Sequence, residues 1–502
     1  MMKNRFLFFQ FLFLLIIPLN LFPEWFLVNG KYNEEWRVEV TSEIKTKNHN
    51  IVTILDFFDP INYSNMMNAQ EITALSSTIK GEKYVLNKII SEDSELNRFI
   101  IKFLDKDYFF INKSYKIKTQ LSLNYSSYDS FYQPKNNPEN PFLRFYEDIP
   151  EEFIKTIEEL VKNKKKNSDV VLSIYSWIKN YFIFSLKTES SAIKEVYKKK
   201  EANLEEILNI WIYALRVAKI PARIIHGYSL PFSLILKENK NKFIFTYPHG
   251  LYHWIEFYFD GIGWIPLDPF NDTLFFVPHN LIRKTNSFYF NSNQDKIYVY
   301  PKYPKDMSFS HSVFSEKTKS EEKLTIQAVL GSENLLITPP LVSEEKPTKK
   351  NVFFNEFFPS EFGVFSNPLK IDMEVTEKEP LSQKLYFEKT KKGYSVTLPL
   401  YFLEINQFGE FWLELQVQGK TYKSFSLKPN FSRISIEYTP VTFVFPELIH
   451  FKDEVILTLK VKNISAVFWY GVIGNPTGDS HDTFKSENEY YHVDMCYKFN
   501  FF

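Results

Sequence analysis

The sequence contains very little cysteine and glycine and has no excess of charge of either sign. One cysteine, Cys496, among 502 residues excludes an intramolecular disulfide framework and any zinc site built from several thiolates. The 60 basic and 60 acidic side chains cancel, so the chain lacks the basic balance that nucleic-acid binding normally requires. We therefore expect no nucleic-acid partner, no cofactor and no metal site.

Apolar and aromatic residues, in contrast, are abundant. Hydrophobic residues make up 44% and aromatic residues 18% of the chain, with 51 Phe and 30 Tyr against only 14 Gly. This composition is too apolar for a disordered protein. The length is sufficient for roughly three or four folded domains.

The first residues have the pattern of an export signal. Lys3 and Arg5 precede a nearly continuous apolar run, Phe6 to Leu19, which fits the central segment of a secretory signal peptide. The run is shorter than the roughly 20 residues of a comfortable membrane span, but a small-residue cleavage motif is missing. We predict that residues 1–23 are a signal peptide or an N-terminal anchor. The protein is then exported, to the periplasm, the cell envelope or the extracellular space, and any membrane contact is through the anchor.

Residues 24–145 have the pattern of β-strands. Apolar and polar residues alternate in the run from Trp36 to Ile44 and again from Tyr115 to Leu123, as in half-buried strands. Several short strands of this kind are typical of a β-sandwich. We predict an N-terminal β-sandwich over this range.

Residues 146–297 have a different character. Apolar residues recur at helical spacing in 151–164, 169–181 and 203–219, and strand-like runs follow at 222–236 and 252–267. Helices followed by strands indicate an α+β domain.

The remainder of the chain is predicted in three parts. Residues 298–360 are rich in Pro, Lys, Ser and Glu and read as a linker with short strands. Residues 361–470 show strand alternation and are predicted as a β-rich domain. Residues 471–502 are predicted as a polar tail. The sequence thus predicts a multidomain protein.

Three segments of the α+β region occur in an informative order. They are ALRVAKIPARIIHGY (Ala214–Tyr228), HWIEFY (His253–Tyr258) and GWIPLDP (Gly263–Pro269). They resemble the bacterial transglutaminase-like superfamily, whose corresponding segments read LLRAxGIPARVVSGY, HxWxEV and GWxxxDPT. The resemblance covers roughly residues 145–285 and implies a papain-like α+β fold for the core.

The resemblance also implies a chemistry, namely acyl transfer by a cysteine thiolate with a histidine proton shuttle oriented by an aspartate. It assigns the histidine to His253 and the aspartate to Asp268. The spacing of the two residues can be tested by hairpin geometry. If Asp260-Gly261 is a two-residue turn, Phe259 pairs with Ile262 and His253 lies directly opposite Asp268.

The nucleophile is the position at which the chain departs from the family. The family cysteine lies twelve positions before the arginine matched by Arg216, and that position holds Leu204. Asn203 has the character of a helix N-cap, with Glu206 placed to complete a capping box. Carboxylates at Glu205 and Glu206 would raise the pKa of a neighbouring thiol, so this helix start does not favour a thiolate.

Three hypotheses follow. The favoured one is an exported transglutaminase-like pseudoenzyme, with His253 and Asp268 as a vestigial pair, that binds a peptide or protein in the old cleft or acts as a scaffold. The second is an active cysteine-type protease, amidase or transglutaminase of the cell envelope that uses Cys496 or an unrecognised group. The third is a structural envelope protein in which the flanking β-domains bind. For His253 alone, a structural histidine is the plainer interpretation.

The export hypothesis predicts where the mature chain begins. N-terminal sequencing of the protein from its native host should place the first residue between about Asn20 and Trp25. An intact Met1 on a membrane-bound product would favour the anchor, and an intact Met1 on a soluble cytoplasmic product would contradict export.

Overall fold

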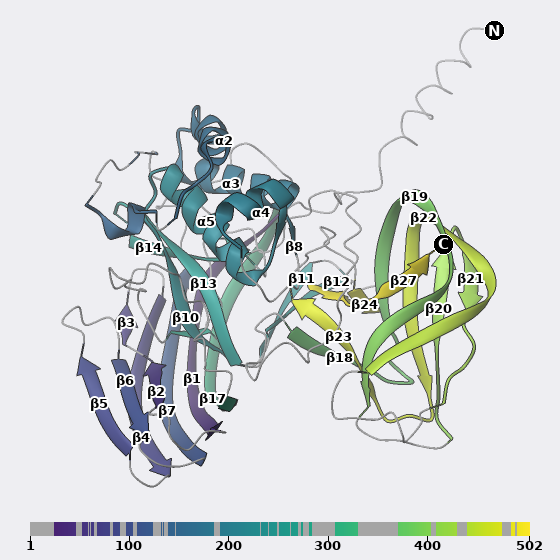
Figure 1. The fold of residues 1–502 in the computed structure, drawn as a ribbon, viewed down its shortest axis with the longest axis horizontal. Helices are drawn as coiled ribbons and strands as arrows, with labels where there is room; N and C mark the ends of the chain where they lie inside the picture. Colours follow the sequence, from purple (N-terminus) through teal and green to yellow (C-terminus); the bar gives the residue numbers. More distant parts are fainter. Residues whose placement is uncertain are drawn as a thin grey trace.

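The computed structural model describes residues 25–123, 132–184, 191–283, 307–329, 370–473 and 483–501, with short gaps inside most of these ranges (Figure 1). The predicted signal peptide or anchor lies outside the described residues. Within the described part of the chain, no helix combines the length and the apolar character needed to cross a membrane.

The N-terminal region is built on a five-stranded sheet. Its order is β17-β1-β7-β4-β3, with bounds Met307–Val329, Trp25–Thr46, Tyr108–Leu123, Asn68–Lys80 and Tyr63–Ser64. The alternation that predicted strands here is real, because Trp36, Val38 and Val40 are buried while their neighbours are more exposed. A separate three-stranded sheet consists of β2 (Thr53–Phe58), β6 (Asn97–Phe103) and β5 (Tyr84–Ile90). The packing of two sheets as a sandwich stays a prediction.

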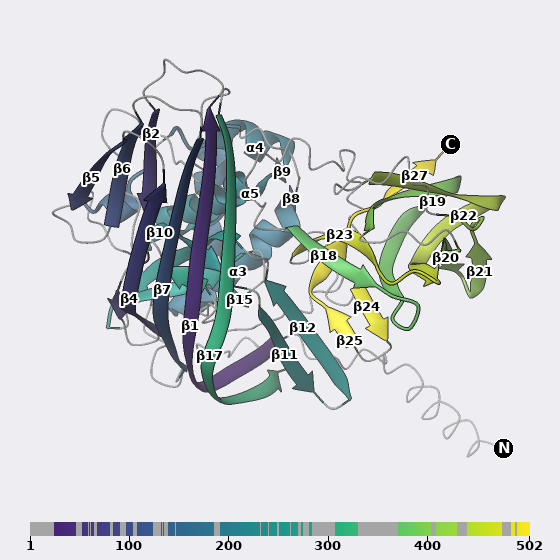
Figure 2. The same ribbon diagram turned by 90° about the horizontal axis from the view of Figure 1, so that it is seen from below.

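Strand β17 differs from the sequence expectation. It lies inside the predicted linker 298–360, yet it is a single strand of 23 residues that pairs antiparallel with β1 along its whole length, from Thr46 opposite Met307 to Trp25 opposite Val329. Its Ser, Lys and Glu content is typical of a linker but equally of an edge strand, where charged residues discourage pairing with other chains. The N-terminal sheet is therefore completed by a strand that follows the core in sequence (Figure 2).

A buried carboxylate joins β1 to β17. The side chain of Glu34 is 0% exposed, accepts a hydrogen bond from the hydroxyl of Tyr32 and forms an ion pair with Lys317. Ser320 Oγ lies 3.3 Å from the same carboxylate, and the ammonium of Lys317 lies 5.1 Å from the ring centre of Trp36. This cluster fixes the register of the two longest paired strands of the sheet.

The central region, residues 139–283, is called the core below. Three of its helices lie where the sequence predicted them, namely α2 (Glu151–Val161), α3 (Asn167–Tyr181) and α5 (Leu204–Val217). Two further helical elements were not predicted, the short η2 (Pro141–Leu143) and α4 (Ile193–Lys199). Its sheet has the order β15-β14-β13-β10-β16, with bounds Thr273–Leu274, Gly263–Asp268, Gly250–Phe259, Ala222–Ser229 and Leu281–Arg283. A short parallel pair, β8 (Ile183–Phe184) and β9 (Glu201–Ala202), precedes α5.

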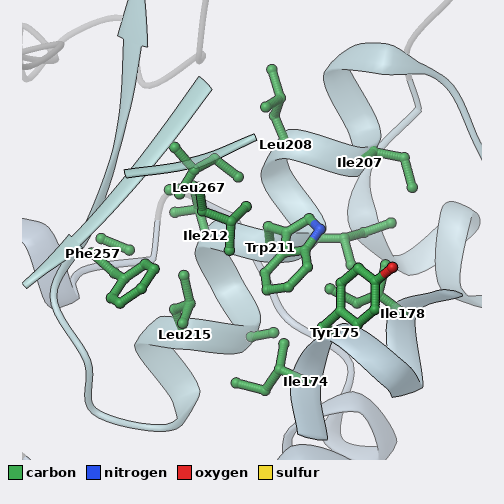
Figure 3. Close-up of a cluster of buried hydrophobic side chains, with 14 of the residues drawn as sticks. Ile174, Tyr175, Ile178, Ile207, Leu208, Trp211, Ile212, Leu215, Phe257 and Leu267 are labelled. Carbon is green, nitrogen blue, oxygen red and sulfur yellow. The ribbon is translucent and has the colours of Figure 1, made fainter. Parts of the chain in front are cut away.

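Helix α5 is the buried centre of the core. Its side chains Trp211, Ile212 and Leu215 lie between helix α3, which contributes Ile174, and the sheet, which contributes Leu267 (Figure 3). Because α5 is apolar on almost every side, it can be stable only when covered by neighbouring elements on all of them.

The C-terminal region, residues 370–501, consists of strands with their own apolar cluster. The strands are β18 (Lys370–Val375), β19 (Leu381–Phe402), β20 (Glu410–Val417), β21 (Lys420–Lys423), β22 (Thr439–Lys462), β23 (Val467–Ile473), β24 (Thr483–Ser486), β25 (Glu489–Tyr491), β26 (Val493–Met495) and β27 (Lys498–Phe501). They share one twelve-stranded sheet with a hairpin of the core, β11 (Phe232–Glu238) and β12 (Asn241–Tyr247).

The predicted polar tail, residues 471–502, is the second difference from the sequence expectation. Strands β24 to β27 take up most of its described residues, and Thr483, Asp494 and Cys496 are buried. The polar groups are accommodated by partners, since Gln383 Oε1 accepts hydrogen bonds from the hydroxyl of Thr483 at 2.6 Å and from the backbone of Met495 at 2.9 Å. Polar composition predicted a tail because these partners lie about 100 residues away in the sequence.

The Glu34 cluster generates a stability prediction. Glu34→Ala should lower the free energy of unfolding by about 2 kcal/mol, because the hydroxyl of Tyr32 and the ammonium of Lys317 lose their shared acceptor. Urea unfolding followed by tryptophan fluorescence measures the change.

A matched control lies on the same strand. Glu39 forms an exposed ion pair with Arg37, so Glu39→Ala should change the free energy of unfolding by no more than about 0.5 kcal/mol. Equal effects of the two substitutions would show that the buried cluster does not stabilise the β1–β17 pairing.

Candidate functional site

The start of helix α5, where the family places its nucleophile, is closed by side chains of the protein itself. Asn203 Oδ1 accepts the backbone N–H of Glu206 at 3.0 Å, and Glu206 Oε2 accepts the backbone N–H of Asn203 at 2.7 Å, so the predicted capping box is present. The other carboxylate oxygen of Glu206 accepts the N–H of Ser191 at 2.6 Å. Leu204 is the first helical residue. A helix start held in this way presents carboxylate charge where a thiolate would need positive potential.

The aspartate of the predicted pair is engaged by a tyrosine. The hydroxyl of Tyr252 on β13 donates a hydrogen bond of 2.9 Å to Asp268 Oδ2, at the end of β14. Both residues are 0% exposed. The structure thus brings Asp268 together with Tyr252.

The predicted register of the β13–β14 hairpin is wrong by one residue. Phe259 lies opposite Gly263, and Ile255 lies opposite Leu267, so three residues connect the strands where a two-residue turn was expected. The cause is the second glycine: Gly261 and Gly263 both have positive φ, 79° and 96°, which suits a three-residue connection.

This shift moves His253 away from the position predicted for it. Cross-strand partners share a face, so Ile255 and Leu267 point the same way. His253 lies two residues from Ile255 and shares its face, whereas Asp268 follows Leu267 and lies on the opposite face. His253 is buried at 3% exposure and lies opposite His226 of β10 in the backbone register.

Tyr252 is the residue that sequence reasoning missed, although a signal for it was present. In the pattern HxWxEV the histidine stands two positions before the tryptophan and four before the glutamate. Trp254 and Glu256 have this mutual spacing, and the position two before Trp254 is Tyr252. The catalytic histidine was assigned to the neighbouring His253 because that residue matches the motif by type.

Glu256 is held by a buried ion pair within the core sheet. Arg223 Nε and Nη2 donate to Glu256 Oε2 at 3.0 and 2.8 Å, and both side chains are almost completely buried. The guanidinium carbon of Arg223 lies 3.9 Å from the ring centre of Trp264, which also contacts the rings of Phe142 at 4.9 Å and Tyr258 at 5.4 Å. These residues brace the β10–β13–β14 sheet from which Tyr252 and Asp268 project.

Cys496, the alternative nucleophile, lies between β26 and β27 in the sequence and is completely buried. Burial, and secondly the charge of Asp494, raises the pKa of its thiol well above the usual value. The thiol is therefore protonated and shielded, which is the reverse of what a reactive cysteine requires. Among the described residues, no cluster of three or more His, Cys, Asp or Glu side chains could hold a metal ion.

A family model matches part of the core. Residues 154–269 match the family model described as Transglutaminase-like superfamily. A protein from Cytophaga hutchinsonii, described as a candidate cysteine protease, is 14% identical, with 63% of this chain and 99% of that one covered and a TM-score of 0.40. The periplasmic domain of TgpA from Pseudomonas aeruginosa is 13% identical, with 46% and 89% covered and a TM-score of 0.24. Among curated proteins there is no match.

The buried thiol generates a pH prediction. The pKa of Cys496 is raised on folding, so its contribution to stability is complete below the pKa of the exposed thiol, near 8.5, and is lost as the pH rises above it, where only the unfolded chain ionises. Between pH 9 and 10 the free energy of unfolding should fall by about 1.4 kcal/mol per unit from this group.

Cys496→Ala is the variant that isolates this contribution. Its unfolding free energy, measured by urea titration at pH 8, 9 and 10, should fall less steeply with pH than that of the wild type. Identical slopes would mean that the thiol ionises as readily in the folded chain as in the unfolded one.

Proposed function

From the transglutaminase-like domain at residues 154–269, we propose that this protein is a pseudoenzyme whose core serves as a scaffold rather than as an acyl-transfer catalyst. The hydrogen bond from Tyr252 to Asp268 carries the proposal. Tyr252 occupies the histidine position of the HxWxEV motif. A tyrosine there retains a donor to the aspartate but cannot act as a proton shuttle near neutral pH, because its pKa lies near 10 and that of histidine near 6.5.

The nucleophile position supports the same conclusion. Leu204 has no group that can attack a carbonyl, and the capping box between Asn203 and Glu206 satisfies the helix start that would otherwise stabilise an anion. Two of three catalytic positions are therefore replaced, and the third, Asp268, has a structural hydrogen-bond partner.

An active enzyme using Cys496 is the alternative, and burial disfavours it. A nucleophile must be ionised and must reach its substrate, and this thiol is buried with a raised pKa. Activity through Cys496 would require the surrounding strands to separate first.

A scaffolding role is supported by the range of residues that share one apolar cluster. The cluster around α5 includes Tyr32 from the N-terminal sheet and Tyr470, Val472 and Cys496 from the C-terminal region. One apolar cluster thus includes side chains of all three regions. That a peptide or protein ligand binds in the former cleft stays a prediction, as does export to the cell envelope, which rests on the charged and apolar start of the chain.

The first test is direct. The purified full-length protein should neither hydrolyse labelled casein nor couple a primary amine to a glutamine-containing peptide, and Cys496→Ala should change neither result. Any turnover in the wild type that Cys496→Ala abolishes would overturn the pseudoenzyme proposal.

The second test rebuilds the site and distinguishes Tyr252 from His253. In a Cys496→Ala background, the thiol introduced by Leu204→Cys should have an unperturbed or raised pKa, measured by the pH dependence of alkylation, even though His253 is present. Adding Tyr252→His should lower that pKa by stabilising the thiolate.

Two further variants complete the comparison. Substituting His253→Ala should leave the thiol pKa unchanged, and far-UV circular dichroism should confirm that each variant is folded, because replacing the buried Tyr252 costs stability. A thiol whose pKa is already low with Tyr252 present, and rises with His253→Ala, would reverse the assignment of the two residues.

A further inference from the structure

The core and the C-terminal region are joined by backbone pairing as well as by side chains. Hairpin β11–β12 lies between β10 and β13 in the sequence but does not belong to the core sheet. Its strand β12 pairs in parallel with β25 of the C-terminal region (Figure 2). The register places Lys242 opposite Glu489 and Ile244 opposite Tyr491. We call residues 232–247 the docking hairpin.

A side-chain ion pair and a backbone hydrogen bond reinforce this short contact. Lys242 Nζ lies 2.7 Å from Glu489 Oε1, and the backbone N–H of His492 donates to the carbonyl of Ile244 at 3.0 Å. Ile244 is 8% exposed, whereas Ile235 on the other strand of the hairpin is 48% exposed. The ion pair is partly solvated and contributes little by itself, which leaves the backbone pairing and the buried Ile244 as the other contributions of the hairpin.

A second contact lies on the other side of the interface. Tyr470, Val472 and Cys496 belong to the apolar cluster of the core and not to the cluster of their own region. Neighbouring Val493, Met495 and Tyr497, in contrast, belong to the cluster of the C-terminal region. Because Cys496 belongs to the apolar cluster of the core, we expect separation of the two parts to expose it.

The docking hairpin also leads directly to the candidate site. Strand β12 ends at Tyr247, β13 begins at Gly250, and Tyr252 is the third residue of β13. A displacement of the hairpin therefore acts on the first residues of β13, and Tyr252 is tied in turn to Asp268.

We propose that the docking hairpin is a coupling element: it holds the C-terminal region on the core, and the docked state and the Tyr252–Asp268 hydrogen bond stabilise each other. Two states are involved, docked and undocked, and the coupling between docking and the hydrogen bond is reciprocal. This inference does not depend on whether the core is catalytic.

Cys496 provides the measurement, because it is the only thiol in the chain. In the wild type, alkylation of the native full-length protein by iodoacetamide at pH 8 should be slow. Ile244→Asp places a charge at the buried position of β12 that pairs with β25 and should raise the alkylation rate at least tenfold. Ile235→Asp is the matched control on the same hairpin and should stay within twofold of the wild type.

The coupling is tested by a variant outside the interface. Tyr252→Phe removes the hydroxyl that Asp268 accepts and should raise Cys496 alkylation at least threefold. Global unfolding rates of all variants, measured by tryptophan fluorescence after a jump into urea and extrapolated to water, give the comparison. Alkylation of the Ile244→Asp variant should be faster than its global unfolding.

Three results would overturn the proposal. Equal alkylation of the Ile244→Asp and Ile235→Asp variants would show that the hairpin does not hold the C-terminal region. Alkylation of Ile244→Asp at its global unfolding rate would show that no undocked state exists apart from the unfolded one. Unchanged alkylation in Tyr252→Phe, with docking otherwise confirmed, would remove the coupling to the site.

Discussion

Burial of helix α5 is the constraint on which the rest of this structure depends. A helix with apolar side chains around nearly its whole circumference cannot face water, and it is covered by α2, α3 and α4 and by the core sheet. The apolar cluster around α5 extends further, to Tyr32 of the N-terminal sheet and to Tyr470, Val472 and Cys496 of the C-terminal region. Burial of this cluster does not depend on the chemistry of the candidate site.

The hydrogen bond from Tyr252 to Asp268 has a structural role of its own, which is separate from any catalytic role. A buried carboxylate needs a hydrogen-bond donor, whether or not the site is active. The tyrosine hydroxyl meets that need for Asp268, and its ring adds apolar volume to a fully buried position. A tyrosine at this position therefore gives the buried carboxyl group a hydrogen-bond donor whether or not the site transfers protons.

Sequence reasoning located the core because its signals are local. Helical spacing in α2, α3 and α5 and the N-cap at Asn203 involve residues within a few positions of each other, and all are present in the structure. It failed where the deciding partner was distant: β17 is recognisable as a strand only beside β1, and the strands of the predicted tail only beside β19 and β23. The hairpin register failed for a finer reason, since the preference of Gly263 for positive φ outweighed that of the Asp260-Gly261 pair for a two-residue turn.

The pairing of β1 with β17 has a consequence for the synthesis of the protein. Trp25 and Val329 are partners, although about 300 residues separate them in the sequence. At roughly 5–20 residues per second, the ribosome needs tens of seconds after finishing β1 to supply the strand that covers its edge. During that time a 22-residue strand has one unpaired edge, on which another nascent chain could form hydrogen bonds. A chaperone that shields strand edges should therefore raise the yield of this protein more than that of a protein whose sheet is closed by sequential hairpins.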